Sequence, residues 1–103
     1  MLRDWLQRKD IEAFATTLAD DFGRRFPPKS EQRTDKGVKN QLASITDGLY
    51  AQAVRFRSEK RLGVYGKAKL GNVFRWQLRE LGYSESFADE ITRGLIVTLA
   101  RRR

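Results

Sequence analysis

The chain has 103 residues; 40% are hydrophobic and 33% are charged, and 21 basic against 13 acidic residues give a net charge of +8. This length suits one compact domain, so we expect a single domain over residues 1–103. The sequence contains no cysteine and no histidine. That composition excludes disulfides, thiolate metal sites, thiol catalysis and the commonest general base. No apolar run approaches the roughly 18 residues of a membrane span, and no signal-peptide pattern opens the chain. We therefore expect a cytoplasmic protein without a membrane partner.

Apolar residues recur at helical spacing along most of the chain, which predicts an all-α fold of about four helices. In the first helical region, residues 2–22, Trp5 and Leu6 lie almost opposite the main apolar stripe, which begins at Ile11. Either the helix breaks near Asp10, which would cap a new helix, or its first turns meet something outside the core. Gly23 is expected to end this helix. The main stripe consists of Ile11, Phe14, Ala15, Leu18 and Phe22.

Residues 24–34 contain the only two prolines and are predicted to form a loop, which Phe26 attaches to the core. A second helix is expected over residues 35–61, with Thr34 or Asp35 as its cap, and it would be roughly 40 Å long. A helix of that length either breaks near Gly48 or projects beyond its own domain, and we favour one long helix. Its heptad-like stripe consists of Val38, Leu42, Ile45, Leu49 and Phe56.

The last third of the chain predicts an antiparallel helix hairpin. The connection Leu62–Gly66 leads into a third helix with the stripe Leu70, Val73, Phe74, Leu78 and Leu81, which Gly82 ends. Ser84 or Ser86 is expected to cap a fourth helix, the latter in a capping box with Asp89. Its stripe is Phe87, Ile91, Leu95 and Leu99. The run Leu95-Ile96-Val97 is apolar around most of the helix circumference, which predicts burial between neighbours.

The residue types and their spacing give no sign of an enzyme. The segment from Gly63 to Ala68 lacks the glycine spacing and the Ser/Thr of a phosphate loop, so it predicts a turn entering a helix, where Lys67 and Lys69 would attract an anion. Most carboxylates fall at helix ends, and the serines have no histidine to activate them. We therefore expect no catalytic residue, no cofactor and no metal.

The leading functional hypothesis is an interaction module that self-associates or docks on a protein partner. It depends on the long second helix with its heptad-like stripe and on the two apolar residues that lie off the main stripe of the first helix. The candidate interface residues are Trp5, Leu6, Leu42 and Leu49.

The alternative is nucleic-acid binding through a basic surface interleaved with aromatic residues. Phosphate contacts and base stacking use such side chains. A solvated cationic face explains the same charge without any ligand. A helix-turn-helix docking mode is disfavoured, because acidic residues would lead the fourth helix into the groove. The candidate binding residues are Arg55, Arg57, Lys60, Arg61, Lys67, Lys69, Arg75 and Trp76.

Overall fold

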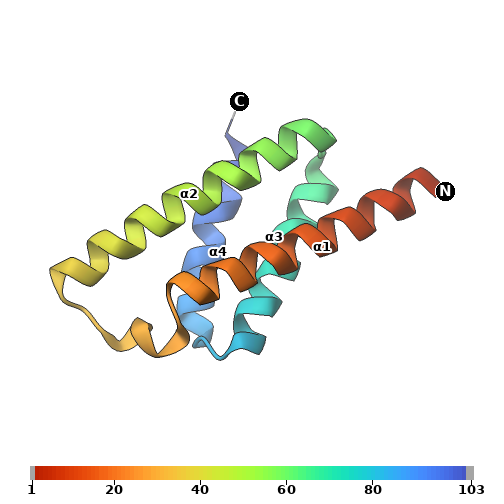
Figure 1. Cartoon of the computed structure of the whole chain (residues 1–103). Helices are drawn as coiled ribbons and strands as arrows, with labels where there is room; N and C mark the ends of the chain where they lie inside the picture. Colours follow the sequence, from red (N-terminus) through yellow and green to blue (C-terminus); the bar gives the residue numbers. More distant parts are fainter. Residues whose placement is uncertain (1, 102–103) are drawn as a thin grey trace.

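The computed structural model describes the backbone of residues 2–101 and the side chains of residues 5–101. This part of the chain contains four α-helices, one short 3-10 helix and no strand, as the apolar spacing predicts. The elements are α1 (Leu2–Arg25), η1 (Pro28–Gln32), α2 (Lys36–Lys60), α3 (Val64–Leu81) and α4 (Glu85–Ala100). The expected C-terminal antiparallel hairpin is formed by α3 and α4 (Figure 1).

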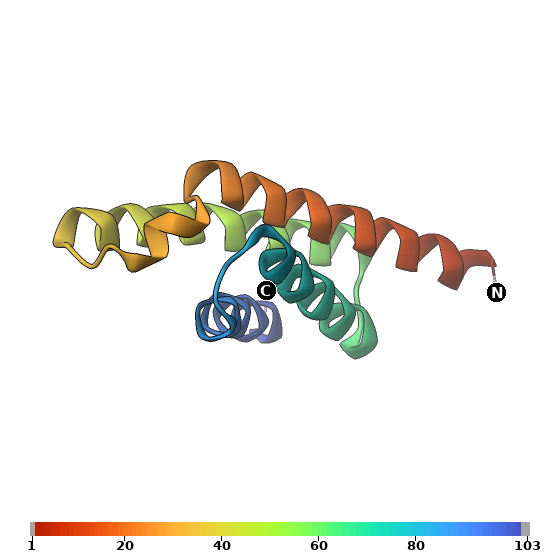
Figure 2. The same ribbon diagram turned by 90° about the horizontal axis from the view of Figure 1, so that it is seen from below.

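The helices form two layers. The long helices α1 and α2 run antiparallel side by side, and the α3–α4 hairpin crosses behind them (Figures 1 and 2). The molecule measures 48 × 28 × 19 Å. Its long axis accommodates α2, which is about 37 Å long at 1.5 Å per residue. Within the described chain, no helix combines the length and the apolar character needed to cross a membrane.

All four helices contribute apolar side chains to one core. An aromatic cluster joins the end of α1 to the start of α4, where Phe26 and Phe87 stack with ring centroids 5.8 Å apart. Phe26 is 2% exposed, which confirms that it attaches the loop to the core. The Tyr83 hydroxyl donates a hydrogen bond to the carbonyl of Phe26, so this corner is also joined by a polar contact. The largest fully buried side chains are Tyr83, Phe22, Phe74, Ile11, Leu18, Leu70, Leu78, Leu95 and Leu99.

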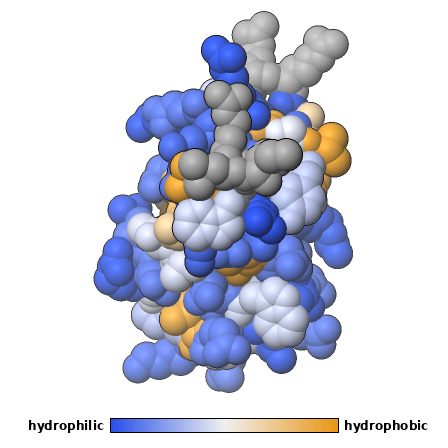
Figure 3. All heavy atoms as spheres, turned by 90° about the vertical axis from the view of Figure 1, so that its right-hand side faces the viewer, coloured by the Kyte–Doolittle hydropathy of each residue, from blue (hydrophilic) through white to orange (hydrophobic). Residues whose placement is uncertain are grey.

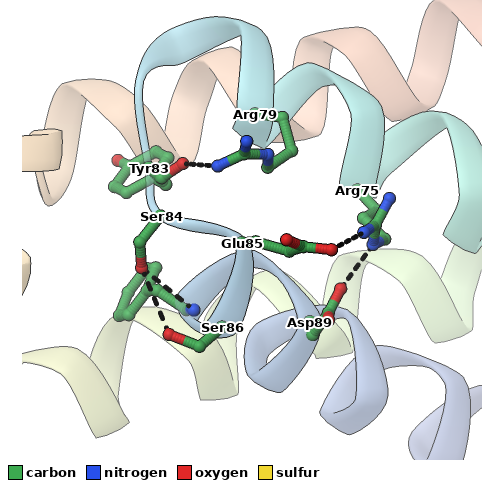
Figure 4. Close-up of polar contacts among 8 residues, drawn as sticks. Arg75, Arg79, Tyr83, Ser84, Glu85, Ser86 and Asp89 are labelled. Atoms are coloured by element: carbon green, nitrogen blue, oxygen red, sulfur yellow. Dashed lines mark hydrogen bonds and ion pairs between the residues drawn. The ribbon is translucent and has the colours of Figure 1, made fainter.

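Asp35, Gly82 and Ser84 end or cap their helices as predicted, whereas the capping box does not form. The Asp35 side chain accepts a hydrogen bond from the backbone N–H of Val38 at 3.0 Å, so Asp35 caps α2. Gly82 ends α3 with φ 111°, a conformation that glycine adopts without steric cost. Ser84 caps α4 (Figure 4), whereas the capping box from Ser86 to Asp89 is wrong. The Asp89 carboxylate binds Arg75 of α3 instead.

The first helix is continuous, which excludes one of the two alternatives, a break near Asp10. Asp10 caps nothing; its carboxylate lies 3.2 Å from the Lys60 ammonium group at the end of α2. The helix also continues past Gly23 to Arg25. Phe22 and Phe26, four residues apart, both lie buried in the core at this corner. In α2 the helix runs unbroken through Gly48, as we favoured, and its N-terminal end extends past α1 (Figure 2).

The predicted burial of Leu95-Ile96-Val97 holds only for its first residue. Leu95 is fully buried, whereas Ile96 is 38% and Val97 49% exposed. The physical reason is that α4 packs against α2 and α3 on one side only, so its other side faces solvent.

Candidate functional site

The structure divides the four predicted interface residues into two pairs. Leu49 is 3% exposed and belongs to the core, and Leu42 packs against that core from its edge. The assignment of Leu49 to an interface is therefore corrected, whereas Leu42 remains partly exposed. Trp5 and Leu6 are 47% and 49% exposed, so they remain available to a partner.

Arg57 is not a surface contact for a ligand. Its side chain is buried, and its Nη1 atom donates hydrogen bonds to the carbonyl oxygens of Leu99 at 2.8 Å and Arg101 at 2.9 Å. The last carbonyls of a helix lack partners within the helix. Arg57 therefore closes the C-terminal end of α4, and its assignment as a nucleic-acid contact is corrected.

Arg75 is held by two carboxylates from the start of α4. It donates to Asp89, its Nη2 atom lies 3.6 Å from Glu85, and both partners point toward it (Figure 4). The hydrogen bond with Asp89 raises the pKa of Arg75 above its usual value. The guanidinium of Arg75 therefore joins α3 to α4. Its two carboxylate partners occupy a side chain that the sequence analysis assigned to a ligand.

Two of the predicted lysines also form ion pairs. Lys60 lies 3.2 Å from Asp10, and the Lys69 ammonium group lies 3.1 Å from a Glu12 carboxylate oxygen. The Lys69 hydrogen bond lowers the pKa of Glu12. Both pairs attach α1 to its neighbours, and both are solvated enough to rearrange at little cost.

The other predicted contacts are exposed, except for the half-buried Lys67, and they are spread from α2 to α3. Among side chains 5–101, no carboxylate lies within 4 Å of Arg55, Arg61 or Lys67. Trp76 is 56% exposed, but it lies twelve residues after the start of α3, about 18 Å along the helix axis.

A groove lies between the first half of α1 and the start of α3. Its volume is about 630 Å³, and we call it the α1–α3 groove. Val64 and Tyr65 stand at its edge, 83% and 65% exposed, whereas Ile11 is fully buried. Seen from this end of the molecule, apolar surface interrupts the surrounding hydrophilic surface (Figure 3). The groove is lined by Gln7, Arg8, Ile11, Gly63, Val64, Tyr65 and Gly66.

A smaller hollow lies beside this groove, and Arg8 lines both. We call it the cationic hollow. The Lys9 ammonium group sits 5.8 Å from the centre of the Trp5 ring, within the range of a cation–π contact. The hollow is lined by Trp5, Arg8, Lys9, Glu12 and Lys69. The structure thus brings Trp5, a predicted protein contact, next to Lys69, a predicted nucleic-acid contact.

The sequence analysis missed Val64 and Tyr65, which it placed in the connection between two helices. They form the first turn of α3, where Gly63 provides no side-chain cap and no acidic residue follows. The available signal was two apolar residues between glycines that fit no stripe of the third helix.

The lining of the groove combines apolar and polar side chains. Residues 5–101 contain no group of three or more histidine, cysteine, aspartate or glutamate residues positioned to hold a metal. The groove offers apolar surface from Val64 and Tyr65, and Gln7 and Arg8 add polar groups to its lining. No protein-family model, no curated protein and no solved structure matches this chain.

Proposed function

We propose that this protein is a non-enzymatic, cytoplasmic helical module that docks on a partner protein through the α1–α3 groove. The observation that carries the proposal is the exposure of Val64 and Tyr65 beside that groove. Burying such side chains against a partner gains about 1.5–3 kcal/mol each, whereas leaving them in water gains nothing. The lack of cysteine supports a reducing compartment.

The packing of α2 moves the proposed docking surface away from the stripe of that helix. Val38 and Leu49 of the stripe that suggested a coiled coil are buried within the chain, and Leu42, Ile45 and Phe56 pack partly against its core, so the stripe gives less support to dimerisation. Four exposed apolar residues lie instead in the first turns of α1 and of α3, namely Trp5, Leu6, Val64 and Tyr65, and the last two are the most exposed large apolar residues among side chains 5–101.

Nucleic-acid binding remains the alternative, and the contacts give it less support. Of the eight predicted residues, Arg57 is buried, and Lys60, Lys69 and Arg75 are paired with carboxylates. Aliphatic surface such as the highly exposed Val64 contributes little to phosphate contact or base stacking.

Photo-cross-linking in the cells that naturally make the protein tests the proposal. The photoreactive residue p-benzoylphenylalanine replaces Tyr65, and Trp76 serves as the matched control because it is an equally exposed aromatic residue of the same helix. We expect discrete protein adducts from position 65 that disappear when Val64→Ser is added, and none from position 76. Equal adducts at both positions, or adducts that nuclease removes, would contradict docking through the groove.

A further inference from the structure

We infer that the α1–α3 groove receives an acidic amphipathic helix from another protein. This inference rests on the proposed docking function and adds the chemistry of the partner.

The charge around the groove is strongly positive. The two stretches that build this end, residues 5–12 and 60–69, contain six basic and two acidic residues. The two acidic residues, Asp10 and Glu12, are already paired with Lys60 and Lys69. The six basic residues are Arg8, Lys9, Lys60, Arg61, Lys67 and Lys69.

Four of these cations are left to act on a partner. Among side chains 5–101, no carboxylate lies within 4 Å of Arg8, Lys9, Arg61 or Lys67. Arg8 lines both the groove and the cationic hollow, while Arg61 and Lys67 lie close in the sequence to the groove-lining residues 63–66. The first turn of α3 adds the positive end of a helix dipole. This turn contains no acidic residue that would neutralise it. A partner that carries carboxylates around an apolar stripe complements this surface.

The walls of the groove favour a helical partner. Both walls are helices, and residues 2–101 contain no strand whose edge could pair with an extended peptide. An amphipathic helix satisfies its own backbone hydrogen bonds and presents apolar side chains at i, i+3, i+4 and i+7. Those side chains would contact Val64 and Tyr65, while acidic side chains beside the stripe would reach Arg8 and Lys67.

A second copy of this chain is a poor occupant. A two-fold symmetric dimer through this end places the same surface against itself. That arrangement would bring the cations of one copy against those of the other, and like charges at an interface cost affinity. The apolar surface therefore favours contact, whereas the charge around it favours a partner of opposite sign.

Selection from a displayed peptide library tests this inference. The library presents helical peptides of about 20 residues, long enough to form a helix on binding. Apolar residues vary along one stripe, and acidic, basic and neutral residues are equally frequent elsewhere. The full-length protein is immobilised, and selection is repeated on Val64→Ser/Tyr65→Ser. We expect the wild-type protein to enrich acidic peptides, and we expect the double variant to lose that enrichment.

Charge-reversal variants then measure the electrostatic part with one enriched peptide as the probe. In fluorescence anisotropy, Arg8→Glu/Lys67→Glu should weaken binding about tenfold at low salt and much less at about 0.5 M salt. Lys36→Glu/Lys39→Glu is the matched control, because it reverses two exposed lysines at the opposite end of α2. The control should change the Kd by less than about twofold. Circular dichroism confirms that each variant is folded.

The outcomes separate the inference from the proposed function. Neutral or basic peptides whose binding depends on Val64 and Tyr65 would overturn the acidic partner and leave docking in place. No peptide enrichment that depends on those residues would overturn both. A thymidine oligonucleotide that binds with the same dependence would assign the surface to nucleic acid. Light scattering that shows a dimer lost in Val64→Ser/Tyr65→Ser would assign it to a second copy.

Discussion

Arg57 distinguishes a structural role from a ligand-binding role, because the sequence assigned it to a ligand and the structure places it inside the protein. We predict that Arg57→Met destabilises the fold. Methionine has a similar helix propensity and an unbranched stem, so α2 and the local packing are largely kept. What is lost are the two hydrogen bonds to the carbonyls of Leu99 and Arg101.

The expected loss is about 2 kcal/mol. A hydrogen bond from a charged donor contributes about 1.5–3 kcal/mol. Two such bonds would exceed our figure, but Arg101 is exposed, so its carbonyl regains water in the variant. Removing a buried charge also recovers part of its desolvation cost. The control is Arg55→Met, which lies two residues earlier in the same helix with an exposed side chain and should change stability by less than about 0.5 kcal/mol.

Urea unfolding followed by circular dichroism measures both variants. For a chain of this size the slope is about 1–2 kcal/mol per molar urea, so the Arg57→Met midpoint should fall by about 1 M or more. The thermal midpoint should fall by about 10 °C. Equal midpoints for Arg57→Met and Arg55→Met would refute the reasoning, since they would show that the two carbonyls need no partner.

Three further predictions follow from the packing of the helices. Burial raises the pKa of Tyr50 and Tyr83 to about 12. The contribution of each neutral tyrosine to the free energy of unfolding is therefore fully present below pH 10 and is lost as pH rises from 10 through 12. In alkaline urea titrations, the free energy of unfolding of the Tyr50→Phe/Tyr83→Phe variant should depend less on pH. A Cβ on Gly71 would meet the terminal methyl of Ile96, and because that side chain is 38% exposed and can shift, Gly71→Ala should cost less than about 1 kcal/mol; adding Ile96→Ala should remove that cost in thermal melts. Gly82→Ala should cost about 1 kcal/mol because φ is 111°, and calorimetry showing no loss would contradict that strain.

The proposed docking surface was only partly visible in the sequence. Trp5 and Leu6 stood out because they lie off the main stripe of their helix, and both are exposed in the structure. Val64 and Tyr65 did not stand out, since a helix that begins at Val64 cannot be distinguished from a turn by two apolar residues alone. Leu49 was assigned to an interface because an apolar stripe predicts burial and does not reveal which chain provides the cover.

By itself, the sequence determined the helical class, the approximate extent of the helices, the position of the α3–α4 hairpin and the caps Asp35 and Gly82. These features depend on apolar spacing and on backbone preferences, which act over a few residues. Only the tertiary structure decided that Arg57 is buried, that Arg75 pairs with α4, and that α1 meets α3 in an open groove. Those properties depend on contacts between residues far apart in the chain, and the same charge can face solvent, a carboxylate or a helix end according to how the helices cross.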